Sequence, residues 1–94
     1  MTPYTVYVVD DEEVAREGVV LALKKLYRIK GFANAEDTIE AVLKNPPDLV
    51  LLDIGLPGMS GIEALRKIIG LYPEVIVIMI TAYEAVQTVV SAMT

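Results

Sequence analysis

The sequence predicts an α/β domain with a doubly wound parallel sheet. Strand-like runs and helix-like segments alternate four times along its 94 residues. The runs at 49–52 and 75–80 are apolar without alternation, which is typical of parallel strands that helices cover on both faces. Because a helix-length segment separates each strand from the next, we expect right-handed crossovers and a parallel sheet.

The first part of the chain contains two predicted strands with a helix between them. Residues 4–9 are mostly β-branched or aromatic and predict a strand that stops at Asp10 and Asp11. Apolar and polar residues alternate over 27–32, which predicts a half-exposed edge strand. The intervening helix begins with acids, which suit the positive end of its dipole. Its predicted apolar face consists of Ala15, Val19, Ala22, Leu23 and Leu26.

The remainder repeats this alternation. Asn34 is the predicted N-cap of a second helix, which Pro46 and Pro47 end. Residues 49–52 form the third strand, which ends at Asp53, and a loop rich in glycine and proline follows. A third helix, the strand at 75–80 and a last helix complete the order. The predicted apolar faces are Ala35, Ile39, Val42 and Leu43, then Ile62, Leu65 and Ile69, and finally Val86, Val89, Val90 and Met93.

The predicted strand order places four polar residues together. With the alternating strand at the edge, we expect the order 2-1-3-4. The chain then adds its second strand on one side of the first strand and its third strand on the other side, so that the direction of progress across the sheet reverses there. Open α/β sheets bind ligands at such a reversal, beyond the carboxyl ends of the strands. Asp10 and Asp11 follow the first strand, Asp53 follows the third, and Thr81 follows the fourth. We therefore expect a ligand site at this edge of the sheet.

The residue types at this edge indicate phosphoryl chemistry. Adjacent carboxylates repel one another unless a cation joins them, and Mg²⁺ suits oxygen ligands together with water and phosphate. Asp53 is then a candidate nucleophile toward phosphorus, and the Thr81 hydroxyl a candidate donor to a phosphoryl oxygen. Taken singly, Asp10, Asp11 and Thr81 are more simply explained as helix caps. It is their combination with Asp53 that favours a phosphoryl site.

Composition excludes several other classes of site. The chain has neither cysteine nor histidine, which excludes disulfides and sites built on thiolate or imidazole. Its net charge of −5 argues against direct binding of nucleic acid by this domain. No apolar run reaches membrane-spanning length, and the start lacks the pattern of a secretory signal. We therefore expect no membrane contact and a cytoplasmic location.

Three segments resemble the receiver domains of bacterial response regulators. They are Val8-Val9-Asp10-Asp11-Glu12, the D-x-x-x-P-x-M-x-G pattern over 53–61, and Ile80-Thr81-Ala82-Tyr83. The resemblance implies a flavodoxin-like fold over residues 1–94. It also implies a regulatory phosphoacceptor domain, not an enzyme, that catalyses only its own phosphorylation and dephosphorylation. Residues 81–93 resemble more narrowly the receivers of sigma-54-dependent transcription activators.

The same resemblance assigns a role to each site residue. Asp53 accepts a phosphoryl group from a histidine kinase and thereby switches an output domain or effector, here expected to control transcription. Mg²⁺ is bound by Asp53, directly by Asp11, through water by Asp10, and by the backbone carbonyl of Gly55. Thr81 is the switch hydroxyl that moves toward the phosphoryl group. Asp53 and Thr81 are thus the reactive pair of the predicted site.

The family pattern continues past the length of this sequence, with a fifth strand that ends in a lysine and then a fifth helix. The 94 residues hold no counterpart of either element, so we expect a receiver domain that is incomplete at its C-terminus. The edge of the fourth strand and the last helix would then lack cover. Homodimerisation or other self-association through them is the expected consequence.

Three other functions compete with this interpretation. A degenerate receiver that acts only in dimerisation or docking stays open, although the three aspartates and Thr81 are all present. A phosphatase of the haloacid dehalogenase type needs a second acid two residues after its nucleophile, where Gly55 stands. A flavin carrier needs a loop of hydroxyl and glycine residues after the first strand, where residues 10–13 are four acids.

Overall fold

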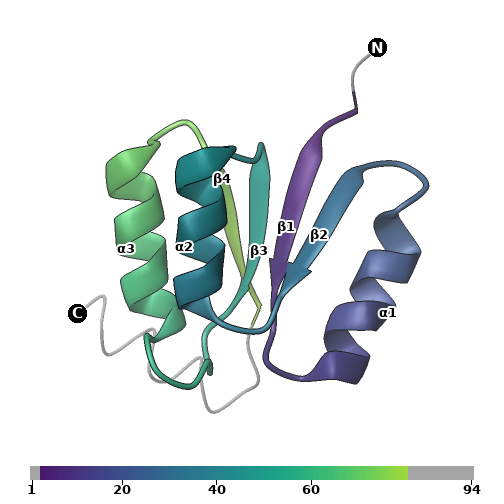
Figure 1. The fold of residues 1–94 in the computed structure, drawn as a ribbon, viewed down its shortest axis with the longest axis horizontal. Coiled ribbons are helices and arrows are strands. Elements are labelled where there is room, and N and C mark those ends of the chain that lie inside the picture. The colour runs from purple at the N-terminus through teal and green to yellow at the C-terminus, as the bar shows by residue number, and fades with distance from the viewer. Residues whose placement is uncertain (1–2, 81–94) are drawn as a thin grey trace.

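A computed structural model describes residues 3–80, and the predicted features at Thr81 and in the last helix lie outside the described residues. Within this range the strands pair in parallel in the order β2-β1-β3-β4 (Figure 1). The predicted α/β class, parallel sheet and strand order are confirmed. The elements are β1 (Thr5–Val9), α1 (Glu13–Leu23), β2 (Arg28–Phe32), α2 (Ala35–Lys44), β3 (Leu49–Asp53), α3 (Gly61–Leu71) and β4 (Ile76–Ile80).

Side-chain caps explain where two of the helices begin. The Asn34 side chain accepts a hydrogen bond from the Asp37 N–H at 2.7 Å, so that it caps α2 as predicted. Ser60 caps α3 in the same way, by accepting from the Glu63 N–H at 3.2 Å. The Ser-x-x-Glu pattern of residues 60–63 is a sequence signal for this second cap, and it was missed.

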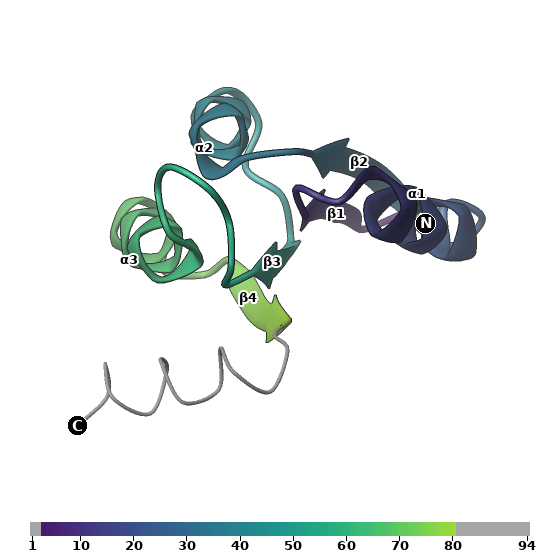
Figure 2. The same cartoon turned by 90° about the horizontal axis from the view of Figure 1, so that it is seen from below.

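The helices cover the two faces of the sheet unequally. α2 and α3 lie side by side on one face, whereas α1 lies against β1 and β2 on the other (Figure 2). The main core lies beneath α2 and α3, where the rings of Tyr7 and Phe32 meet edge to face at 5.0 Å. Its most deeply buried members, each with an exposed fraction of 1% or less, are Val9, Ala35, Val42, Val50, Leu52, Ala64 and Ile68.

Within residues 3–80, the sheet face turned toward α1 is covered by a helix only over β1 and β2. On this face, β1 is buried, but Leu49 and Leu51 of β3 are only half-buried. In the described part of the chain, helices cover only one face of β3 and β4, and the predicted last helix lies outside this part, so the expectation that helices cover both faces stays a prediction. The other face is open here because α1 lies beside β2, and no described helix reaches β3 or β4 on that side. The exposed fractions in β4 are 60% for Ile76, 46% for Ile78 and 45% for Ile80.

Some residues of the predicted helix faces also point to solvent. α1 ends at Leu23, so the prediction that its apolar face continues to Leu26 is wrong. None of the residues of α1 is fully buried. In α2 and α3, Leu43 and Ile69 are exposed. The residues that precede them, Val42 and Ile68, face the core instead. The exposed members of the predicted faces are Ala22, Leu26, Leu43 and Ile69.

No helix within residues 3–80 has the length and apolar character needed to cross a membrane.

Candidate functional site

Three aspartates meet at the carboxyl edge of the sheet. Asp10 and Asp11 follow β1, and Asp53 is the last residue of the adjacent strand β3. Each offers a carboxylate oxygen, and these oxygens lie within 4.8 Å of one another. Asp10 and Asp53 are half-buried, and Asp11 is exposed. The structure thus brings together the three carboxylates that the strand order placed at this edge.

Asp10 is held by hydrogen bonds at its backbone and its side chain. Its N–H donates to the Phe32 carbonyl at 3.0 Å, and its carboxylate accepts from the Glu12 N–H at 2.9 Å. Its carbonyl accepts from Arg16 Nη1 at 2.8 Å. The Arg16 stem passes over Gly31, where an added Cβ would lie 3.1 Å from it. Asp10 therefore forms a turn just before α1 and belongs to the cluster, but it does not cap the helix, whose N-cap residue is Glu12.

The backbone that follows Asp53 folds back tightly on the strand. The Gly55 N–H donates to Asp53 Oδ1 at 3.0 Å, and the Ile54 N–H donates to the Ile80 carbonyl at 3.2 Å. At Gly61 an added Cβ would collide with the Asp53 carbonyl oxygen and lie 2.7 Å from the Ile54 Cα. Only glycine permits this close approach at the first residue of α3. The final glycine of the D-x-x-x-P-x-M-x-G pattern is thereby explained by packing.

A contact from α2 secures the same loop. The Met59 N–H donates to Glu36 Oε1 at 3.0 Å, and the preceding Gly58 has a φ of +73°. Both Glu36 carboxylate oxygens lie 3.5 Å from the position that a Gly58 Cβ would occupy. Sequence reasoning missed Glu36, because 23 residues separate it from Met59 and no local pattern signals the contact.

The electrostatics of the cluster favour a bound cation. Burial raises the pKa of Asp53, and the negative charges of Asp10 and Asp11 raise it further, while the Gly55 N–H acts in the opposite direction. Without a cation, ionisation of Asp53 is therefore less favourable than that of a free aspartate. A divalent ion at the three carboxylates would reverse this effect by offsetting their charge.

The donor set fits Mg²⁺. With metal–oxygen distances of about 2.1 Å, oxygens on opposite sides of one Mg²⁺ are roughly 4.2 Å apart. Adjacent oxygens are about 3.0 Å apart, so the three carboxylates, whose oxygens lie within 4.8 Å of one another, must move closer together to share one ion. The role of the Gly55 carbonyl as a further ligand stays a prediction. Thr81 lies outside the described residues, and its neighbour Ile80 is the register partner of Asp53.

Comparison with known proteins identifies the family. Residues 6–94 match the response regulator receiver domain, and the chain belongs to this family. It is 38% identical over 93 residues to the probable transcriptional regulatory protein TcrX of Mycobacterium tuberculosis. That match covers 98% of this chain and 40% of TcrX. The chain spans about two fifths of the length of this and other curated relatives, such as the response regulator GacA of Pseudomonas aeruginosa.

Solved structures agree with the family and the fold. The BeF3-activated receiver domain of DrrB, from Thermotoga maritima, is 32% identical with a TM-score of 0.82, over 100% of this chain and 80% of that one. NtrX from Brucella abortus is 32% identical with a TM-score of 0.85, over 99% of this chain and 22% of that one. The expected flavodoxin-like receiver fold is confirmed. The matched proteins have different names, so they do not assign this chain to one subgroup. The resemblance to receivers of sigma-54-dependent activators stays a prediction.

Proposed function

We propose that this domain accepts a phosphoryl group on Asp53 and thereby switches an output function. The observation that carries the proposal is the meeting of three carboxylates within 4.8 Å at the reversal of a receiver-family sheet. The proposed donor is a phosphohistidine kinase. The proposed output is a domain or effector that regulates transcription, since TcrX is a probable transcriptional regulator. The proposed location is the cytoplasm.

In the proposed reaction, an Asp53 carboxylate oxygen attacks the phosphorus of the donor. A phosphorus–oxygen bond forms, the phosphorus–nitrogen bond of phosphohistidine breaks, and the departing imidazole takes up a proton. The Gly55 N–H holds Oδ1 of Asp53 at 3.0 Å and so limits rotation of the carboxylate. Asp10, Asp11, Asp53 and the Gly55 carbonyl would hold Mg²⁺, which offsets charge on the phosphoryl oxygens. Thr81 is the proposed donor to one of those oxygens.

Phosphorylation by a small donor tests this function directly. Incubation with acetyl phosphate and Mg²⁺ should add one phosphoryl group, measured by intact mass, and the Asp53→Asn variant should gain none. Asp48→Asn is a matched control, since Asp48 accepts from the Thr5 N–H near the opposite end of β3. The control should be phosphorylated like the unmodified protein. A phosphoryl group that persists in Asp53→Asn would disprove the assignment.

Magnesium binding tests the cluster separately from the chemistry. At a hundredfold excess over Kd, Mg²⁺ should stabilise the fold by about 2.7 kcal/mol, measured by urea denaturation. Asp11→Asn should abolish most of this gain, because it removes a ligand charge from the cluster. A gain of equal size in the variant would show that the ion binds elsewhere.

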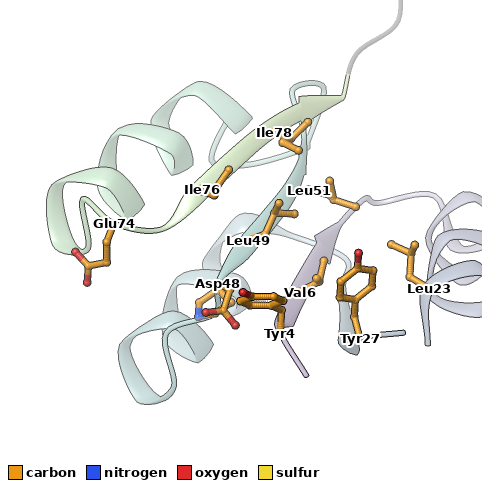
Figure 3. A pocket seen from close by; sticks show the side chains of 11 residues that line it. Tyr4, Val6, Leu23, Tyr27, Asp48, Leu49, Leu51, Glu74, Ile76 and Ile78 are labelled. Carbon is orange, nitrogen blue, oxygen red and sulfur yellow. The ribbon is translucent and has the colours of Figure 1, made fainter. Parts of the chain in front are cut away.

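The open side of β4 favours a second proposal, namely self-association. Among residues 3–80, β4 pairs only with β3, so its other edge is free of strand partners there. A groove of about 600 Å³ runs over the same side of the sheet, between Ile78 and Tyr27 (Figure 3). A second copy of the chain lying on this face would cover these apolar side chains, and strand pairing along β4 would satisfy its free edge. Light scattering should then show mass increasing with concentration, and a constant monomer mass would exclude this arrangement.

A further inference from the structure

We propose that Glu36 is a positioning residue that holds the loop between β3 and α3 against the carboxylate cluster. The loop comprises residues 54–60, and its first turn contains Gly55. In this role Glu36 supports Mg²⁺ binding without being a ligand, since the carboxylates that meet are those of Asp10, Asp11 and Asp53. The inference rests on the proposed function of that cluster and adds a residue from a different element, α2.

One loop residue donates a hydrogen bond to the Glu36 carboxylate, and the preceding residue lies near it. The Met59 N–H donates to Oε1 at 3.0 Å, and a Cβ built on Gly58 would lie 3.5 Å from both oxygens. The φ of +73° at Gly58 is the reason for glycine there, since a Cβ 3.5 Å from the carboxylate would make only an ordinary van der Waals contact. The backbone is thus shaped to bring one donor to this acceptor.

The loop has few other polar anchors. Its start is tied by the Gly55 N–H to Asp53, and the Gly61 N–H donates to the Ile54 carbonyl at 3.3 Å. Between these points Leu56 is buried with an exposed fraction of 7%, and Met59 packs at the border of the core. Gly55 and Gly58 can each adopt many backbone conformations, whereas Pro57 between them has a restricted φ. In the second half of the loop, Ser60 is tied to α3 by its cap, and Glu36 supplies the hydrogen bond that joins Met59 to α2.

The contact is more specific than a helix-dipole interaction. An acid in the first turn of α2 would favour the positive helix end in many rotamers. Glu36 instead reaches across to a backbone 23 residues away, whereas the neighbouring Asp37 accepts from the Asn34 amide at 3.1 Å. Because Glu36 is exposed, its hydrogen bond should contribute little to global stability and mainly restrict the loop.

Three variants separate this role from a simple change of charge. Glu36→Met removes the acceptor and the charge, Glu36→Gln removes only the charge, and Glu40→Met removes one charge from an exposed site on α2. Glu40 pairs only with Lys44 among the described residues, and that pair is exposed. Each variant is measured for Mg²⁺ affinity by calorimetry and for exchange of the Met59 amide by NMR in metal-free protein.

We expect Glu36→Met to weaken Mg²⁺ binding roughly tenfold, the low end of the loss when a residue supporting metal ligands is removed. The Met59 amide should exchange faster in this variant, also by about tenfold, with little change in the melting temperature. Glu36→Gln should restore most of the protection, since its carbonyl oxygen can still accept. Glu40→Met should leave the Met59 amide unchanged.

The outcomes distinguish this inference from the function on which it rests. If the unmodified protein binds no Mg²⁺, the proposed function of the cluster fails, and the exchange of the Met59 amide alone decides whether Glu36 holds the loop. If Mg²⁺ binds normally and Glu36→Met matches Glu40→Met in both measurements, Glu36 has no positioning role. If the two methionine variants weaken Mg²⁺ binding equally and the exchange of the Met59 amide is unchanged, Glu36 affects the site only as a distant negative charge.

Discussion

The two faces of the sheet differ in how fully helices cover them. Under α2 and α3, Val50 and Leu52 are fully buried, whereas Leu49 and Leu51 on the other face of β3 remain half-buried. The candidate site depends chiefly on the covered face. Leu52 directly precedes Asp53, and Leu56 packs the following loop into the same core. Precise placement of the carboxylates is therefore expected to follow the stability of this face more than that of the other.

The largest expected effect is loss of packing on the covered face. Leu52→Ala should lower the free energy of unfolding by about 3–4 kcal/mol, because Leu52 is fully enclosed and leaves a cavity. Leu51→Ala, its neighbour on the opposite face, should cost roughly half as much, since solvent already reaches that site. Urea denaturation followed by circular dichroism measures both. Equal losses would remove the distinction between the faces.

A glycine pair within α3 provides the next test. Gly61→Ala should destabilise the fold by about 2 kcal/mol or more, since its Cβ would strike the backbone of Asp53 and Ile54. Gly70→Ala should instead stabilise it by roughly 0.5–1 kcal/mol, because nothing lies within 4 Å and alanine favours the helix. The same denaturation experiment decides. A neutral Gly61→Ala variant would show that the loop does not need this close approach.

The sequence predicts the fold well because its signals are local and repeated. Apolar runs, a proline pair and the Asn34 cap mark the elements, and the alternation over 27–32 identifies β2 as the edge. The strand order then brings Asp10, Asp11 and Asp53 together without any knowledge of side-chain contacts. The positions of the three carboxylates follow from topology alone, which is why they could be expected in advance.

Other features depend on tertiary contacts that leave no local pattern. The apolar sequence of residues 76–80 predicts a strand, but it does not tell which of its faces a helix covers. The contacts of Glu36 with Met59 and of Arg16 with the Asp10 carbonyl join segments through side chains that resemble ordinary solvated charges in the sequence. Such contacts become visible only once the loops have been placed.

The pH dependence of stability tests the electrostatics of the site. Because the pKa of Asp53 is raised in the folded state above its ordinary value of 3.8, folding gains from its protonation. That gain is fully present below pH 3.8 and is lost as pH rises through the folded pKa. Metal-free Asp53→Asn should therefore exceed the unmodified protein in melting temperature at neutral pH, and this advantage should shrink on acidification.

The smallest expected effect lies on the open face. Ile78 is 46% exposed, so Ile78→Thr should lower the free energy of unfolding by less than about 1 kcal/mol in dilute protein. Val50→Thr on the covered face should cost more, roughly 1–3 kcal/mol, because it introduces a hydroxyl among buried apolar groups. Threonine retains a strong preference for strands, so the comparison reports burial more than backbone propensity. If a second copy covers β4, the cost of Ile78→Thr should increase with protein concentration. A small cost that stays constant over the range used for light scattering would leave this face open to solvent and remove the support for self-association through β4.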